Sequence, residues 1–537
     1  MTTLLINGRI HSPAMPDATA MAVSDGPDAV VRWLGSDTVG RAQFPDAEVI
    51  DLDGAFVAPA FVDSHVHVTA TGLSVDGLDL RGATSLDHLL RMVAEHAGRH
   101  PDGPIWGHGW DETTWPRPVP PTTADLDALL GDRPAYLARV DVHSAVASTA
   151  LRRLTADLEA EPGWAAQEPL TAAAHHRVRA VARSLLTPDQ LRTARLSALD
   201  LAARSGIVAV HECAGPEIGG LDDWLAVRAL DHGVDVVGYW GEAVASADAA
   251  RELIATTGAA GLAGDLFIDG ALGSHTAWLS SPYEDASDTC GNAYLTPEAV
   301  EAHLAACTAA GVPAGFHVIG DAAVATVVDA MDRVVAQFGA PAVARCGHRL
   351  EHLEMVDADQ AARLGACGVI ASMQPNFDAL WGGRDGMYGQ RLGADRAAGL
   401  NPLALLAAKG VPLAFGSDAP VTSIEPWGTV RAAIHHRTKG SAISARAAFS
   451  AATRGAWRAA GVRDGVTGTL VPGAPASYAV WEISGGPERL EVAAPTDTVQ
   501  RWSTEPGSRV PALPRLDPAD PLPRCLRTVH RGRVLHE

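Results

Sequence analysis

Short apolar runs alternate with alanine-rich stretches over most of this chain, from about Val57 to about Gly461. The runs GIVAVHE, VPAGFHVIG, GVIASMQP and VPLAFGSDAP have the length and composition of buried strands. Helix starts are marked between them, because Thr187-Pro188-Asp189 and Thr296-Pro297-Glu298 each place a capping hydroxyl before proline. Regular alternation of strand and helix predicts parallel βα units, as in a (β/α)₈ TIM barrel.

The two ends of the chain have a different pattern. LLINGRIH, VVRWLG and AEVIDLDG near the start combine short apolar runs with turn signals that favour hairpins, and GTLVPGAPASYAVWEI and RTVHRGRVLHE near the end are similar. We therefore expect one small β-sandwich built from residues 1–57 and 462–537 beside a barrel over 58–461. Residues from about 69 to 200 exceed an ordinary crossover, which predicts an inserted subdomain over the barrel mouth.

The charge and the cysteines argue against several functions. The 537 residues carry a net charge of −21, which repels nucleic acid and anionic lipid. The chain shows neither a signal-peptide pattern nor an apolar run of membrane-spanning length, so we expect a cytoplasmic protein. Its 6 cysteines form no Cys-x-x-Cys pair and predict reduced thiols, so that histidine and carboxylate would have to hold any metal.

The stretch PAFVDSHVHV ends an apolar strand with two imidazoles one residue apart. His65 and His67 point to the same side of such a strand because successive side chains alternate. On its own the pair fits two hydrogen-bonded core histidines or a surface pair as well as a metal site, since imidazole is the commonest side-chain ligand for zinc-like ions.

Three further ionisable residues fall at strand ends: His317 in VPAGFHVIGD, His352 in RCGHRLEHLE and Asp418 in VPLAFGSDAP. Each has an ordinary structural role open to it, such as a core histidine, a partner of Glu351 or Glu354, or a helix cap. Their equivalent placement favours a metal cluster, because the carboxyl ends of barrel strands converge on one active-site face.

The ordered motifs HVH, DGALGSHTA, GFHVIGDAAV, RLEHLE and FGSDAPV resemble the amidohydrolase superfamily, and in particular its YtcJ-like branch, which includes N-substituted formamide deformylases. The similarity extends to GWDETTW and RVDVHSAVAS in the expected insertion and to TGTLVPGAPASYAVW near the end. The resemblance implies a barrel beside a β-sandwich and a metal-dependent hydrolase that cleaves a non-peptide C–N bond in an amide or formamide.

The resemblance also implies roles for these residues. His65, His67, His317 and His352 would be metal ligands, and Asp418 would be both a ligand and the general base. Asp418 would take the proton of the attacking water and pass it to the departing amine, while the metal or a protonated His352 would stabilise the oxyanion. The implied cofactor is one or two divalent ions, with zinc the best match to imidazole and carboxylate ligands.

One position departs from the family pattern. The branch usually has a carboxylated lysine that bridges two metals where this chain has Asp265, four residues before Asp269. Asp265 could still reach a metal, but a solvent-facing or hydrogen-bonding role is the simpler expectation. A single tight metal held by His65, His67, His317 and Asp418 is then the expected arrangement.

The expected insertion supplies the candidate substrate-binding residues Trp110, Asp111 and His143, although GWDETTW would also suit a packed loop. His211, His275 and His348 are expected to support the site or the core. A small-molecule substrate is the expected partner, and a homodimer stays open beside a monomer. Two alternatives to an amide hydrolase also remain: a deaminase or cyclic-amide hydrolase using the same site, and a catalytically silent metal-binding scaffold.

Overall fold

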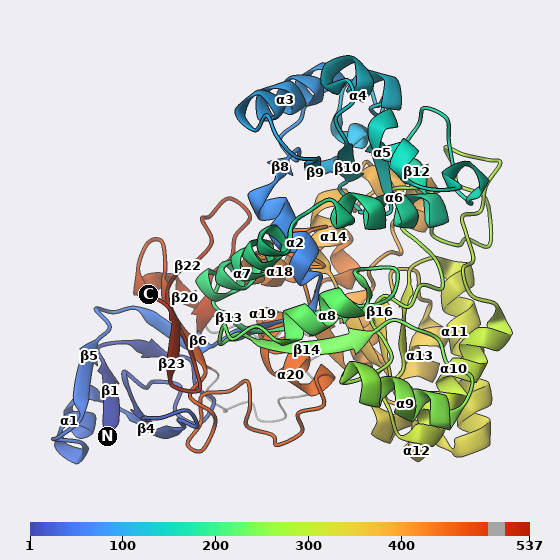
Figure 1. Ribbon diagram of the computed structural model, residues 1–537. Coiled ribbons are helices and arrows are strands. Elements are labelled where there is room, and N and C mark those ends of the chain that lie inside the picture. The colour runs from blue at the N-terminus through green and yellow to red at the C-terminus, as the bar shows by residue number, and fades with distance from the viewer. Residues whose placement is uncertain (492–510) are drawn as a thin grey trace.

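The computed structural model describes residues 1–491 and 511–537, and strands from both ends of the chain form two sheets within it (Figure 1). The first has the order β4-β3-β1-β5, with β1 Thr2–Ile6, β3 Ala20–Ser24, β4 Val31–Gly35 and β5 Glu48–Asp51, and α1 (Asp37–Gln43) lies against it. The second has the order β2-β6-β19-β22-β23, with β2 Arg9–Ile10, β6 Phe56–Pro59, β19 Tyr478–Glu482, β22 Arg524–His530 and β23 Arg533–His536. Leu5, Met21, Val57, Tyr478 and Val529 share one hydrophobic core, so the two ends of the chain stabilise each other.

Only one of the three expected N-terminal hairpins forms. β3 and β4 pair antiparallel, as the turn between them predicts. The turn at Asn7-Gly8 instead carries the chain from β1 in the first sheet to β2 in the second, and the segment after β5 makes the same change to β6. The hairpin interpretation of LLINGRIH and AEVIDLDG was wrong. In each case the strands before and after the turn belong to different sheets, which pack on one shared core.

The central part has a TIM-barrel-like α/β fold whose parallel pairings return to their starting strand. The members, in chain order, are β7 (Phe61–Val66), β13 (Ile207–Ala214), β14 (Asp235–Trp240), the irregular segment 261–267, β15 (Gly315–Val318), β16 (Arg349–His352), β17 (Ile370–Met373) and β18 (Leu413–Phe415). A parallel bridge from Val66 to Ala419 joins the last member to the first. All carboxyl ends therefore meet at one face.

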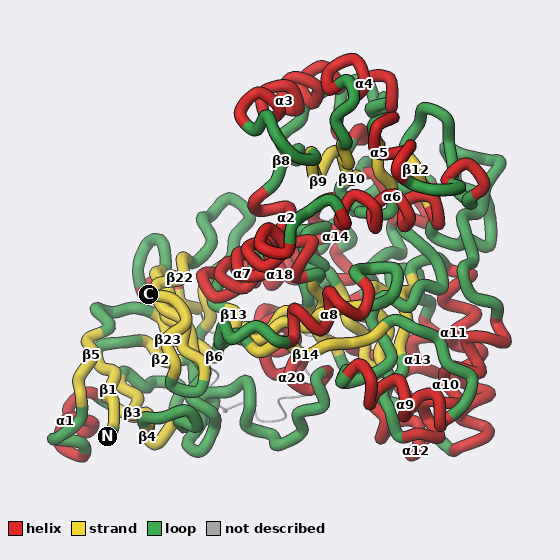
Figure 2. Tube along the Cα trace, in the orientation of Figure 1, coloured by secondary structure: helices red, strands yellow, loops and turns green. Residues whose placement is uncertain are grey.

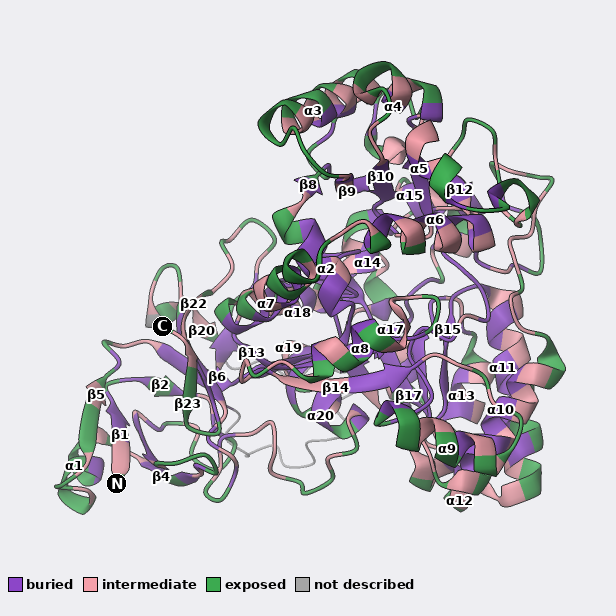
Figure 3. Ribbon diagram, viewed as in Figure 1, coloured by how far each residue is buried: buried purple, intermediate pink, exposed green. Residues whose placement is uncertain are grey.

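Helices surround these strands, and Figure 2 shows the helices outside the strand cluster. They include α7 (Pro188–Arg204), α8 (Gly220–Arg228), α9 (Ala247–Thr257), α10 (Pro297–Ala310), α11 (Asp321–Phe338), α12 (Ala340–Cys346), α13 (Ala358–Ala366), α17 (Leu403–Ala408), α18 (Pro426–Ile434), α19 (Ala445–Ser450) and α20 (Ala456–Ala459). The predicted caps are confirmed, since Thr187 and Thr296 precede α7 and α10 and accept backbone hydrogen bonds. Figure 3 shows buried strands and helices with exposed outer faces. Among the helices of the described segments, none combines the length and apolarity needed to cross a membrane.

The insertion after the first barrel strand has its own sheet, in the order β12-β11-β10-β9-β8 (Figure 1). Its strands are β8 (Leu78–Asp79), β9 (Ile105–Trp110), β10 (Ala135–Arg139), β11 (Ser144–Ala147) and β12 (Leu170–Thr171), and its helices are α3 (Leu86–Arg99), α4 (Thr123–Leu130), α5 (Thr149–Leu154) and α6 (Ala172–Ser184). The expected span of 69–200 also takes in α2 (Val68–Asp76) and most of α7, which pack on each other against the barrel. Three more helices follow β17: α14 (Pro375–Trp381), α15 (Met387–Leu392) and α16 (Ala394–Ala397).

The contact between α2 and α7 sets the position of the chain directly after the first strand. A Cβ added at Gly72 would lie 1.7 Å from the Ala194 carbonyl oxygen, so Gly72→Ala must push α2 away from α7. We expect it to lower the free energy of unfolding by about 1–3 kcal/mol. Gly98→Ala is the matched control, because Gly98 lies in α3 with open space around it and alanine favours a helix. Denaturant unfolding measures both, and equal stability of the two variants would contradict the close-contact role of Gly72.

Candidate metal centre

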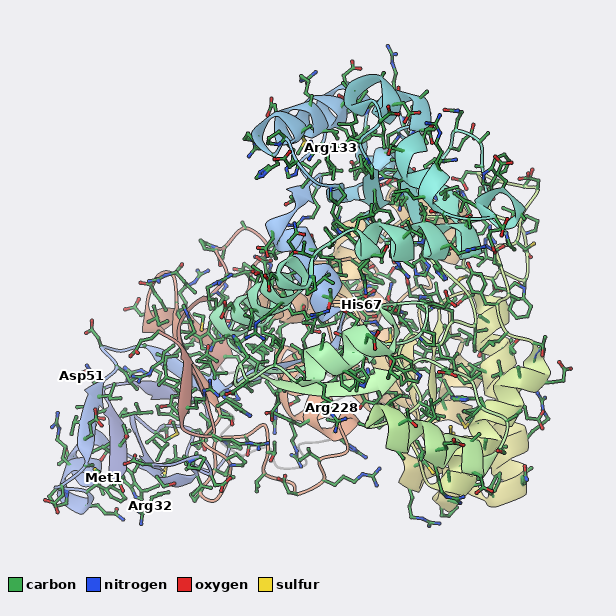
Figure 4. All side chains as sticks on the ribbon, viewed as in Figure 1. Met1, Arg32, Asp51, His67, Arg133 and Arg228 are labelled. Carbon is green, nitrogen blue, oxygen red and sulfur yellow. The ribbon has the colours of Figure 1, made fainter. Side chains whose placement is uncertain are left out.

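Four predicted ligand residues converge at the carboxyl ends of the barrel strands. His65 lies near the end of β7, His67 caps the start of α2, Asp265 belongs to segment 261–267 and Asp418 follows β18. The Nε2 atom of His65 is 3.4 Å from Asp265 Oδ1 and 3.4 Å from Asp418 Oδ1. The Nε2 atom of His67 is 3.1 Å from Asp265 Oδ2 and 3.3 Å from Asp418 Oδ1. Two imidazoles and two carboxylates therefore face one small space, and Figure 4 labels His67 where the barrel meets the inserted segment.

The hydrogen bonding of these residues fits a bound cation. His65 Nε2 and Asp265 Oδ1 are buried and have no hydrogen-bond partner within the described residues. Buried polar atoms normally have hydrogen-bond partners. A buried nitrogen and oxygen that face each other without such partners therefore favour a cation bound between them. Two imidazole nitrogens and two carboxylate oxygens form a donor set that suits a zinc-like divalent ion.

The electrostatics of the cluster also favour a cation. Burial alone lowers the pKa of the His67 imidazole, but hydrogen bonding and charge from Asp265 and then Asp418 raise that pKa to about 9. The two carboxylates thus attract positive charge into a buried space, and a metal ion would supply that charge with the imidazole neutral.

Asp265 is where the structure departs most from expectation. Its side chain is only 7% exposed and is shared between His65 and His67, so the solvent-facing role is wrong. A residue shorter than lysine reaches the cluster because segment 261–267 lies against the neighbouring strands, with Phe267 bridged to His317.

His317 and His352 form a second group beside these four residues. Their ring centroids are 4.4 Å apart, and the His352 ring is 4.9 Å from that of His65. Burial and then the neighbouring His352 lower the pKa of His317 to about 3, which keeps its imidazole neutral. Among the described residues, several groups of three possible metal-ligand atoms lie within 4.8 Å of one another. His352 belongs to one of these groups, with His65 and Asp418, but His317 belongs to none. The structure thus groups Asp265 with His65 and His67, whereas among the described residues the expected quartet of His65, His67, His317 and Asp418 does not lie within that distance.

Left-handed backbone conformations direct two of these side chains. Regular alternation along β16 would place His352 on the face opposite Arg349 and Glu351. The φ angle of His352 is +69° and that of Asp418 is +56°, both in a region that non-glycine residues rarely adopt. Such conformations persist where the surrounding structure enforces them, which is common at functional sites.

Charged residues in the barrel interior hold His65 in place. His65 Nδ1 donates to Glu351 Oε2 at 2.9 Å, which leaves Nε2 as the free lone pair. Glu351 in turn receives two hydrogen bonds from Arg349, whose guanidinium also donates to the Ser64 carbonyl and the Ser372 hydroxyl. The side chains of His65, Glu351 and Arg349 are all fully buried. The sequence interpretation missed Arg349, although its alternation with Glu351 along the short strand RLEH was a readable signal.

His352 is oriented in the same way, by a neutral partner. Its Nδ1 donates to Gln374 Oε1 at 2.8 Å, which leaves Nε2 toward the cluster. The partners considered from sequence have other contacts, since Glu351 binds His65 and Glu354 accepts a hydrogen bond from Asn401.

The three supporting histidines lie outside the cluster. His211 contacts Arg349 at 3.0 Å, so it belongs to the network behind His65. His275 pairs with Asp285 near the surface, and His348 accepts the Ala314 N–H in the core.

Asp269 and Asp321, two other carboxylates near these motifs, are held elsewhere. Asp269 accepts the backbone N–H groups of Trp278, Ile319 and Gly320. Asp321 accepts the backbone N–H of Ser280.

Two cavities adjoin the cluster, with about 600 and 380 Å³ of empty space. His143 lines both, and its ring is 5.2 Å from that of His317. Trp110 and Asp111 line neither: the Trp110 ring is in the core of the inserted segment, and Asp111 caps a turn and pairs with Arg139. Both residues contact Arg139, which lines the smaller cavity. Of the three substrate candidates, only His143 reaches a cavity.

The Glu351 contact yields a test of how His65 is positioned. We expect Glu351→Gln to lower stability by about 3–5 kcal/mol, because it leaves the Arg349 charge buried and unpaired. We also expect about 10- to 100-fold weaker metal binding, because the amide orients His65 less firmly. Denaturant unfolding and metal titration measure these effects. Glu301→Gln, which breaks an exposed pair with Arg333, should cost less than about 1 kcal/mol and leave metal binding unchanged. The same metal affinity in both variants would mean that Glu351 does not position His65.

Comparison with known proteins places this chain. Residues 48–536 match the amidohydrolase family. The chain is 27% identical to the protein LONG AFTER FAR-RED 3 of Arabidopsis thaliana (89% of this chain, 86% of the relative) and 26% identical to the putative amidohydrolase YtcJ of Bacillus subtilis (76% and 79%). A shorter match, 29% identical over 153 residues, covers 27% of this chain and 28% of the N-substituted formamide deformylase of Arthrobacter pascens. An uncharacterized metal-dependent hydrolase from Pyrococcus furiosus superposes with a TM-score of 0.67 and 27% identity, over 89% of this chain and 98% of that one. The chain belongs to the amidohydrolase family, in its YtcJ-like branch.

Proposed function

We propose that this protein is a metal-dependent hydrolase that cleaves a non-peptide C–N bond, in an amide or formamide, on a small molecule. The observation that carries the proposal is the convergence of His65, His67, Asp265 and Asp418 on one buried space with unpartnered donor atoms. The family membership and the metal-dependent hydrolase from Pyrococcus furiosus support a divalent metal, and we propose zinc. The catalytic unit would be a (β/α)₈ barrel, with the terminal sheets as a β-sandwich.

A divalent ion held by these four residues would polarise the substrate carbonyl and make a water molecule acidic enough to attack near neutral pH. Asp418 is placed to accept the proton of that water, because its carboxylate faces the ligand space beside His65 and His67. The same carboxyl would then deliver the proton to the amine nitrogen, since an amine leaves poorly as an anion.

His352 would act on the other reacting atom. Its Nδ1 donates to Gln374, so a protonated His352 also has a hydrogen on Nε2, which faces the cluster and can donate to the carbonyl oxygen as negative charge develops there. Its imidazole also stacks on Phe377, with the planes 9° apart, which limits its rotation. A fixed group loses little freedom as the reaction proceeds, so it is an effective stabiliser of that charge.

The substituted-formamide class is supported by the named activity of the Arthrobacter pascens relative. A panel of N-substituted formamides, aryl amides, cyclic amides and amino-heterocycles assayed with metal-loaded protein separates amide hydrolysis from deamination. No turnover of any class by protein that retains metal would favour the catalytically silent scaffold.

The metal content tests the ligand assignment. Asp265 cannot be carboxylated, so we expect one tightly bound metal rather than two, and activity that does not respond to added bicarbonate. Elemental analysis should show about one equivalent in the wild type and its loss in the His65→Ala/His67→Ala double variant. The His275→Ala variant is the control, because His275 pairs with Asp285 away from the cluster. Full metal retention by the double variant would overturn the assigned centre.

The Asp418→Asn variant tests the proton transfer. We expect turnover to fall by at least about 10²- to 10⁴-fold, because the amide cannot shuttle a proton, while the protein stays folded by circular dichroism. Asp321→Asn should keep near wild-type turnover, since Asp321 binds Ser280 outside the cluster. Comparable rates for Asp418→Asn and the wild type would assign the base to another group.

A further inference from the structure

The two cavities beside the cluster differ in chemistry. The larger cavity contains the cluster residues His67 and Asp265, and α6 of the inserted segment contributes His176 and Arg179 to its wall. The smaller cavity contains Asp418, together with several aromatic side chains. A substrate whose scissile bond lies at the cluster can therefore extend into two different environments.

Within the part of the chain that the structure describes, the guanidinium of Arg179 forms no ion pair with a carboxylate. Its Nη2 atom donates to the backbone carbonyl of Glu217 at 2.6 Å, and its Nε atom is buried with no hydrogen-bond partner within the described residues. The carboxylate of Glu217 pairs instead with His176 at 3.2 Å. Burial lowers the pKa of Arg179, and the nearby charges of Glu217 and Asp265 offset that effect only in part. Arg179 is partly buried, and a cation in such a place without a paired carboxylate favours an anionic ligand.

A second arginine of the same wall is only partly compensated. Arg183 lies 3.3 Å from Asp223, but Asp223 makes a shorter contact of 2.7 Å with Arg195. One carboxylate thus serves two guanidinium groups. Arg183 adds positive potential to the cavity that Arg179 lines.

The smaller cavity shows the opposite balance. Its arginine, Arg139, has Asp111, Glu112 and Asp141 within 3.0 Å. Burial opposes ionisation of Arg139, yet these carboxylates raise its pKa, so its positive charge is fully compensated.

That wall also has apolar and aromatic side chains, from Phe377, Trp381, Met387, Tyr388 and Val421, beside polar ones such as Asp141, His143 and Glu354. Such a surface suits an aryl or alkyl group.

From these two walls we infer that the substrate is a charged amide, with a carboxylate on one side of the scissile C–N bond bound by Arg179 and an apolar, aromatic group on the other side bound in the smaller cavity. This inference rests on the proposed hydrolase function and narrows its substrate class. A carboxylate matches the planar guanidinium, which can donate two parallel hydrogen bonds to it.

Matched substrate pairs test the charge requirement. N-phenylsuccinamate carries its carboxylate on the acyl side and phenylacetylglycine on the amine side, and the methyl ester of each removes only the charge. We expect one of the two acids to have a KM about 10- to 100-fold lower than its own ester, with a similar kcat. The preferred acid also reports the orientation of the amide. Equal KM values within both acid–ester pairs would overturn the inference.

Variants of α6 assign the effect to Arg179. Arg179→Met should raise the KM of the preferred acid about 10- to 100-fold and leave that of its ester unchanged, and Arg179→Lys should restore part of the loss. Arg177→Met is the matched control, because Arg177 lies on the same helix, pairs with Glu161 and does not line the cavity. An identical acid preference in Arg179→Met and wild-type protein would exclude Arg179 as the carboxylate site.

A binding measurement separates this inference from the hydrolase proposal. The ketone 4-oxo-5-phenylpentanoate results from replacing the amide N–H of either N-phenylsuccinamate or phenylacetylglycine by CH2, so it has the shape of both substrates and no C–N bond to cleave. Calorimetry on metal-loaded protein should show that an acid binds more tightly than its methyl ester, and that Arg179→Met removes the difference. Such binding without hydrolysis of any amide would refute the hydrolase proposal and keep the carboxylate site. Hydrolysis of neutral amides without a preference for acids would keep the hydrolase proposal and refute the carboxylate site.

Discussion

The buried hydrogen bond between His65 and Glu351 is the interaction on which the rest of the site depends. It fixes which nitrogen of His65 is free, and it works only because Arg349 keeps the Glu351 carboxylate ionised inside the barrel. Burial raises the pKa of a carboxyl, but here Arg349 and His65 hold that of Glu351 well below its usual range. A charge pair in such an environment is stable only when its remaining hydrogen bonds are satisfied.

That condition ties the centre to the whole barrel. The guanidinium of Arg349 reaches Ser64 on β7, His211 on β13 and Ser372 on β17, and it stacks at 4.2 Å over the ring of Tyr239 on β14. Five strands therefore meet at one side chain. These contacts of Arg349 hold the strands that carry the candidate ligands in fixed positions. A metal site needs such support, because its ligand atoms must stay at fixed separations.

The inserted segment adds what the barrel alone lacks. The strand ends supply the candidate ligands, whereas the insertion supplies His143, which lines both cavities, and Arg179, which lines the larger one. In the proposed function, the barrel would supply the chemistry and the insertion would select the substrate. This division explains why a shared set of barrel motifs does not by itself name a substrate.

Local sequence patterns determined much of this protein. The strand-and-helix alternation predicted the parallel fold, and the capping residues Thr187 and Thr296 predicted two helix starts, because these signals act over a few residues. The spacing of His65 and His67 likewise followed from strand geometry alone. The sequence could not predict which strands pair. The strands on either side of Asn7 have the same local pattern but lie in different sheets, because their pairing depends on the shared core.

Only the tertiary structure decided the composition of the metal centre and its surroundings. Asp265 joins His65 and His67 because an irregular segment lies close to the barrel strands, and His317 lies outside that group although its sequence position looked equivalent. The distinction between Arg139 and Arg179 is of the same kind. Both are arginines near the insertion's motifs, but the first is surrounded by carboxylates and the second is not. Charge compensation depends on distances between residues far apart in the chain, and a single sequence does not contain those distances.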